Sequence, residues 1–147
     1  MRIFVTGATG FVGSAVVDEL LGAGHTVLGL ARDAAKSTAL QRKGADVLHG
    51  DLADLECLAQ GARDCDAVIH TAFNHDFSRF AENCAMDARA IEALGDALGG
   101  TARPLVTTAG VALLAAHGPV ATEHDACMPP SAAYPRRSEA ATAALAA

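Results

Sequence analysis

The segment Thr6-Gly7-Ala8-Thr9-Gly10-Phe11-Val12-Gly13 decides the fold of this chain. Its glycines follow the spacing G-x-x-G-x-x-G, and the segment joins an apolar run to a helical pattern. In such a turn the first glycine takes a positive φ, the second lets an anion approach the backbone, and the third lets the helix pack on the strand. We therefore expect a phosphate group at the helix N-terminus, held by free N–H groups. A turn that only connects strand and helix is the alternative, but the flanking elements favour the first interpretation.

Short apolar runs alternate with helical segments along the chain, which is typical of parallel β-α-β units. The runs carry Val, Ile and Leu at both odd and even positions, as strands covered on both faces do. We expect an α/β fold, a Rossmann-type doubly wound parallel sheet of order 3-2-1-4-5 in three α/β/α layers. The five predicted strands are Arg2 to Thr6, Thr26 to Ala31, Asp46 to His49, Ala67 to Thr71 and Pro104 to Thr108.

Apolar positions at helical spacing, together with caps and glycine stops, mark the helices between these strands. Asp54 is a predicted N-cap, and Gly99-Gly100 is predicted to close the longest helix. The residues from Gly110 to Pro130 are predicted to form a loop. The predicted helices are Val12 to Leu21, Ala34 to Arg42, Asp54 to Ala62, Ser78 to Leu98 and Ser131 to Ala147.

The composition indicates one domain spanning residues 1–147, since 147 residues with 51% hydrophobic content can build one core. The formal charge of -6 is spread over interspersed residues, which argues against a nucleic-acid partner. No apolar run predicts a membrane span, and the N-terminus lacks the pattern of a signal peptide. The four cysteines form no disulfide-like framework, so we expect reduced thiols and a cytoplasmic location.

The end of the second strand, Leu28-Gly29-Leu30-Ala31-Arg32-Asp33, indicates which dinucleotide is bound. A carboxylate at this strand end would accept a hydrogen bond from the ribose 2′-hydroxyl of NAD, whereas Arg32 can pair with the 2′-phosphate of NADP. Asp33 stands one residue late and is expected to belong to the following turn. NADP is therefore favoured, NAD remains possible, and a solvated Arg32 is the alternative.

These residues resemble the short-chain dehydrogenase/reductase superfamily, specifically the extended and atypical branches that include the NAD(P)-dependent epimerase/dehydratase family. The resemblance lies in the glycine loop, in Gly50-Asp51-Leu52 and in Val68-Ile69-His70-Thr71-Ala72. It implies that Asp51 reaches the adenine amine, although Asp51 could instead cap the next helix, and His70 could equally be a hydrogen-bonded strand-end residue. The cofactor-binding residues implied are Gly7, Thr9, Gly10, Phe11, Val12, Gly13, Arg32, Asp51, Leu52, Thr71 and Ala72.

The resemblance further implies that Thr108 and Tyr134 carry the catalysis. Thr108 would polarise a carbonyl or alcohol, and Tyr134 would move the proton. The family has a lysine four residues after the tyrosine, where this chain has Ser138. A phenol needs its pKa lowered by about three units, roughly 4 kcal/mol, to act near neutrality. Arg137 on the same helical face, or the neighbouring Arg136, could replace the ammonium; structural packing roles for Thr108 and Tyr134 remain the alternative.

Several other polar residues are given ordinary roles. Asp87 falls near a position where extended members often carry Asn, which leaves a relay role there in doubt. Histidines and cysteines such as His75, His117, His124 and Cys127 match no zinc spacing, so no metal is expected. Met86 is expected in the core rather than at the cofactor.

The function expected from the resemblance is that of an NADP-dependent oxidoreductase, epimerase or dehydratase acting on a small carbonyl, alcohol or sugar-nucleotide substrate. Family members are about twice as long, and the C-terminal region that supplies most of the substrate pocket is absent from this sequence. A non-catalytic NAD(P)-binding sensor and an inactive truncated member are the alternatives. A homo-oligomer is possible.

Overall fold

One parallel sheet forms the centre of the protein. The structure, a computed structural model, describes residues 1–112, 114, 120–122 and 124–146. Its strands are β1 (Arg2–Thr6), β2 (Thr26–Ala31), β3 (Asp46–His49), β4 (Ala67–His70) and β5 (Leu105–Thr107). They pair in parallel in the order β3-β2-β1-β4-β5, which confirms the predicted Rossmann-type sheet.

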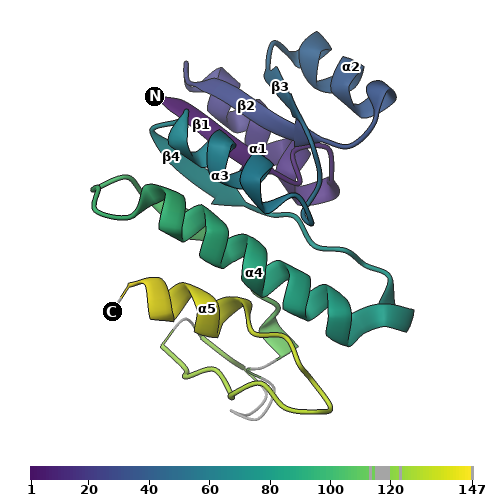
Figure 1. Ribbon diagram of the computed structural model, residues 1–147, viewed down its shortest axis with the longest axis vertical. Coiled ribbons are helices and arrows are strands. Elements are labelled where there is room, and N and C mark those ends of the chain that lie inside the picture. The colour runs from purple at the N-terminus through teal and green to yellow at the C-terminus, as the bar shows by residue number, and fades with distance from the viewer. Residues whose placement is uncertain (113, 115–119, 123, 147) are drawn as a thin grey trace.

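Helices cover both faces of this sheet (Figure 1). Helices α1 and α2 share a core with one face, which includes Val5, Val17 and Leu40, and α3 and α4 share a core with the other, which includes Phe4 and Leu58. Helix α5 lies beside α4 and packs on it through Ala141. The helical bounds are α1 (Phe11–Gly22), α2 (Ala34–Lys43), α3 (Leu55–Arg63), the short 3₁₀ turn η1 (Phe77–Arg79), α4 (Phe80–Leu98) and α5 (Ser138–Leu145).

The helix ends follow the predicted caps. The Asp54 carboxylate accepts a hydrogen bond from the Cys57 amide at 3.0 Å, which confirms Asp54 as the N-cap of α3. Gly99 is the C-cap of α4. These caps satisfy backbone groups that the helix itself leaves unpaired.

The last helix begins later than predicted, at Ser138 rather than Ser131. Tyr134 forms a turn with Ser131, whose amide donates to the Tyr134 carbonyl at 3.0 Å. Pro135 then disfavours helical backbone angles at Tyr134, so the chain enters α5 only after Arg137. The predicted loop from Gly110 to Pro130 includes residues 113, 115–119 and 123, which lie outside the described part of the chain, as does residue 147.

Arg103 fixes the approach to β5. Its guanidinium donates to the carbonyls of Ala62, Arg63 and Cys65 at the end of α3, and to that of Ala97 near the end of α4, over 2.9–3.3 Å. A cation at the C-termini of two helices also complements their dipoles. Among the helices within the described ranges, none is both long and apolar enough to cross a membrane.

Gly61 on α3 is a position away from the crevice where the packing leaves no room for a side chain. A Cβ there would lie 2.6 Å from two ring atoms of Phe4, which is fully buried and cannot move aside. We expect Gly61→Ala to lower the free energy of unfolding by about 1–2 kcal/mol, since overpacking outweighs the gain in helix propensity. Chemical denaturation of the purified chain measures this difference.

Gly22, the last residue of α1, provides the matched control because a Cβ there meets nothing within 4 Å. Gly22→Ala should raise the free energy of unfolding by about 0.5–1 kcal/mol. Equal effects of the two substitutions would contradict the packing of α3 on Phe4.

Candidate cofactor and substrate site

A crevice of about 920 Å³ lies at the carboxyl ends of the strands. In doubly wound sheets this edge is where ligands bind, at the point where the strand order reverses. The crevice is lined by all of the predicted cofactor-binding residues: Gly7, Thr9, Gly10, Phe11, Val12, Gly13, Arg32, Asp51, Leu52, Thr71 and Ala72. The fold thus brings together residues that lie up to 65 positions apart in the sequence.

The glycine loop has the geometry that its spacing predicts. Gly7 has φ +68°, in the left-handed region that favours glycine, and its carbonyl accepts from the Gly10 amide at 2.8 Å. A Cβ on Gly13 would lie 2.1 Å from the Gly7 oxygen and 2.7 Å from Thr71 Oγ1. Only glycine therefore lets α1 approach the turn this closely. Gly10, the N-cap of α1, makes no side-chain cap, so the first amides of the helix are available to an anion.

Two cations line the crevice at the end of β2. They are Arg32 and Lys36, the latter from the first turn of α2. The Asp33 carboxylate accepts from the Lys36 amide at 2.9 Å and caps α2, so Asp33 belongs to the following turn as expected. The Asp33 carboxylate is therefore engaged as the N-cap of α2.

Asp51 lines the crevice but does not cap the next helix. Its carboxylate accepts from the Ala53 amide at 2.8 Å, while Asp54 caps α3. The capping role considered for Asp51 is therefore wrong. A Cβ on the preceding Gly50 would lie 2.4 Å from the Cys57 sulfur, which explains the glycine there.

His70 is a buried, hydrogen-bonded strand-end residue. Its Nδ1 lies 2.8 Å from Thr6 Oγ1 and its Nε2 lies 3.2 Å from a carboxylate oxygen of Asp87, with His70 and Asp87 both buried. The next residue, Thr71, does line the crevice, and its hydroxyl donates to the Thr6 carbonyl at 2.8 Å. His70 at the end of β4 thus lies in the core, and Thr71, the residue after the strand, lines the crevice.

Of the two predicted catalytic residues, Thr108 lines the crevice and Tyr134 lies at its border. Thr108 lines the crevice, and its hydroxyl donates to the His70 carbonyl at 3.2 Å. Tyr134 does not line the crevice, but Gly110 does. The Tyr134 hydroxyl lies 3.0 Å from the position that a Cβ on Gly110 would take. Its ring packs edge-on against Phe80 at 5.6 Å between centroids. Tyr134 therefore borders the site at Gly110.

Ser138, which occupies the position of the family's lysine, is buried and hydrogen-bonded in the core. Its side chain is 1% exposed and donates to the Asp87 carboxylate at 2.5 Å, while accepting from Arg136 Nε at 2.9 Å. Arg136 lines the crevice, with its guanidinium carbon 4.0 Å from the centroid of the Phe73 ring. The helical face expected to join Tyr134 and Arg137 does not exist, because both precede α5, and Arg137 is exposed.

Sequence reasoning missed several lining residues. Met86, expected in the core, is half-buried and lines the crevice. Phe73 directly follows the β4 motif, a position that could have signalled its place at the strand end. The other lining residues not predicted are Leu30, Ala31, Lys36, Ala53, Asn74, His75, Ala109 and Gly110, whereas Arg136 was considered only as a replacement for the lysine ammonium.

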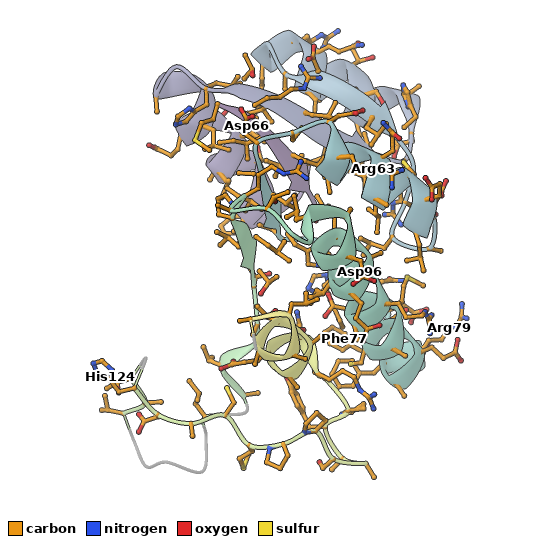
Figure 2. The ribbon with its side chains drawn as sticks, turned by 60° about the vertical axis from the view of Figure 1, so that its left-hand side comes forward. Arg63, Asp66, Phe77, Arg79, Asp96 and His124 are labelled. Carbon is orange, nitrogen blue, oxygen red and sulfur yellow. The ribbon has the colours of Figure 1, made fainter. Side chains whose placement is uncertain are left out.

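The cysteines are free thiols and are poorly suited to nucleophilic roles. Burial is the main cause that raises the pKa of Cys57, Cys65 and Cys84, and a hydrogen bond to Glu139 raises that of Cys127. Within the described residues no three His, Cys, Asp or Glu side chains are grouped to hold a metal. His117 lies outside those residues, and the segment with His124 extends away from the sheet (Figure 2).

Comparison with known proteins yields relatives along most of the chain. An uncharacterized protein of Schizosaccharomyces pombe is 52% identical over 123 residues, which are 84% of this chain and 42% of the relative. An uncharacterized protein of Saccharomyces cerevisiae is 44% identical over 128 residues, again 42% of the relative. The chain thus spans less than half the length of these curated relatives.

The fold is shared with solved structures. The enzyme WbmG of Bordetella bronchiseptica, solved in complex with NAD and UDP, superposes with a TM-score of 0.78 at 23% identity, over 99% of this chain and 49% of WbmG. Residues 3–142 match the sequence model of the NAD-dependent epimerase/dehydratase family. The crevice, the glycine loop and this match together show that the chain belongs to the NAD-dependent epimerase/dehydratase family.

Proposed function

We propose that this chain binds NADP in the crevice and forms the cofactor-binding part of an NADP-dependent oxidoreductase, epimerase or dehydratase. The observation that carries the proposal is the glycine loop, in which Gly7 and Gly13 allow a contact that any Cβ would block. A dinucleotide pyrophosphate fits this turn because the α1 amides and the helix dipole favour an anion there. Bound NADP would supply the hydride acceptor or donor.

The choice of NADP over NAD rests on the end of β2. Arg32 and Lys36 both line the crevice there, and the Asp33 carboxylate is occupied by the cap of α2. A guanidinium and an ammonium favour a 2′-phosphate, whereas NAD recognition usually needs a carboxylate at this place. WbmG, whose structure holds NAD, shares the fold but does not decide this preference.

Asp51 and Thr71 complete the proposed cofactor contacts. Asp51 accepts from the Ala53 amide through Oδ1, so its Oδ2 can accept from the adenine amine, while Leu52 supplies an apolar contact beside it. Thr71 and Ala72 line the crevice next to the glycine loop, where they can contact the central part of the dinucleotide. These assignments rest on the position of each residue in the crevice.

The proposed chemistry is proton transfer beside hydride transfer. Thr108 can polarise a substrate oxygen once its hydroxyl turns from the His70 carbonyl to that oxygen, and Tyr134 at Gly110 can transfer the proton. Tyr134 and Arg136 both lie at Gly110, where a Cβ would be 3.0 Å from the Tyr134 oxygen and 4.0 Å from Arg136 Nη1. The substrate is a small carbonyl, alcohol or sugar nucleotide.

Substitution of Arg32 tests the cofactor assignment. We expect NADPH to bind at least about tenfold more tightly than NADH, and Arg32→Ala to remove most of this preference by weakening NADPH alone. Titration calorimetry with both cofactors measures the two affinities. Arg42, an α2 residue that does not line the crevice, gives the control Arg42→Ala, which should bind both as the unsubstituted chain does. Equal affinities unaffected by Arg32→Ala would refute the phosphate assignment.

Substitution of Tyr134 tests the chemistry. NADPH oxidation with a panel of small carbonyl compounds should fall by about 10²–10⁴-fold in Tyr134→Phe, while the NADPH affinity stays constant. The control is Thr101→Val, since the Thr101 hydroxyl hydrogen-bonds to Leu98 at the end of α4 and to Arg103 and does not line the crevice. Tight NADPH binding with no oxidation, unchanged by Ser138→Lys, would instead favour a non-catalytic sensor.

A further inference from the structure

Arg136 is a second cationic site in the crevice, at the opposite end from Arg32. The sheet order puts β2, and with it Arg32, on one side of the glycine loop, and puts β4 and β5 on the other. Arg136 lines the crevice together with Phe73, which follows β4, and Thr108, which follows β5. A dinucleotide that extends from Arg32 across the glycine loop would leave Arg136 to the reacting partner.

We propose that Arg136 and Phe73 form a carboxylate-binding site, and that the substrate is a flat apolar or aromatic carbonyl compound carrying a carboxylate. This inference rests on the proposed function, since it assigns the dinucleotide to the other half of the crevice. It narrows the substrate from a broad range of carbonyls, alcohols and sugar nucleotides to an acid.

The guanidinium is held in place from two directions. Phe73 lies under it at 4.0 Å, a distance at which the ring face attracts a cation. Its Nε donates to Ser138 Oγ at 2.9 Å, and the buried Ser138 hydroxyl donates in turn to Asp87 at 2.5 Å. Asp87 is itself fixed by His70. A side chain oriented in this way loses little further entropy when a ligand binds.

The outer edge of the guanidinium remains available. Across the residues that the structure describes, Nε is the only nitrogen of Arg136 with a hydrogen bond to the protein. Nη1 lies 4.0 Å from the position of a Cβ on Gly110, so this nitrogen lies beside the part of the crevice that Gly110 lines. These two nitrogens can donate in parallel to the two oxygens of one carboxylate.

The surroundings favour a flat carboxylate over a phosphate. Phe73 makes edge contacts with His75 at 5.4 Å and with Phe80 at 6.2 Å between ring centroids, which gives an aromatic wall beside the guanidinium. Arg136 is the one cation among the described lining residues from this end of the crevice, whereas phosphate sites usually gather several donors or charges. An acid with a planar body can stack along the wall while its carboxylate meets Arg136.

Benzoate serves as the probe of this site. Calorimetric titration of benzoate into the chain saturated with NADP should give a measurable affinity, and benzamide, which has the same shape without charge, should bind at least about tenfold more weakly. Arg136→Ala should weaken benzoate by at least about tenfold, and Arg136→Lys should recover only part of the loss because an ammonium lacks the paired geometry. Phenyl phosphate tests the other anion and should bind no better than benzoate.

Arg137→Ala is the matched control, since Arg137 adjoins Arg136 but is exposed and does not line the crevice. It should leave benzoate binding unchanged. Equal benzoate affinities in the Arg136 and Arg137 variants, or benzamide binding as well as benzoate, would overturn the proposal. Stronger binding of phenyl phosphate that depends on Arg136 would overturn the choice of carboxylate.

The same samples separate this inference from the proposed function. NADPH affinity should be unaltered in Arg136→Ala, which also shows that the variant is folded. If benzoate binds through Arg136 to the chain without cofactor while NADPH does not bind, the proposed function fails and the carboxylate site stands. If NADPH binds and benzoate does not, the carboxylate site alone fails.

Discussion

The close packing of α1 on the turn after β1 is the contact on which the crevice depends. A side chain at Gly13 would meet the Gly7 carbonyl at 2.1 Å and the Thr71 hydroxyl at 2.7 Å. The absence of a Cβ at Gly13 therefore allows α1 to lie close both to the turn after β1 and to Thr71, the residue after β4. The same approach directs the helix amides toward the crevice, so the packing of the fold and the anion site share one cause.

A second constraint runs through the interior as a chain of buried polar groups. It leads from Thr6 on β1 through His70 on β4 and Asp87 on α4 to Ser138 at the start of α5. Buried polar groups are costly unless they are hydrogen-bonded, and each of these groups has a partner. The chain of hydrogen bonds links the strand before the glycine loop to the helix that follows Arg136. Ser138 is thus the end of a buried network, and the family's lysine would have to displace it.

The sequence predicted the parts of the structure that depend on local pattern. The strands, their order, the caps and the lining of the cofactor half follow from glycine spacing, apolar runs and resemblance. The surroundings of Ser138 were not predictable, because they depend on a contact with Asp87 over 51 positions. The contact between Phe80 and Tyr134 has the same origin, since these two rings become neighbours only through tertiary packing. The late start of α5, in contrast, had a local signal in Pro135, which disfavours helical angles at Tyr134.

Helix α5 has one further consequence, for the local stability of the site. It is eight residues long and rests on α4 through small contacts, with Ala141 near Ala88 and Leu145 over Gly95. A helix this short is stable only while it is docked, and it opens at a lower free energy than the central strands do. Arg136 and Tyr134 precede it, whereas the glycine loop belongs to the strands. Amide hydrogen exchange is therefore expected to be faster in α5 and the segment before it than in the strands beside the glycine loop. A ligand on Arg136 would slow amide exchange in α5, because it would hold in place the residues that precede this helix.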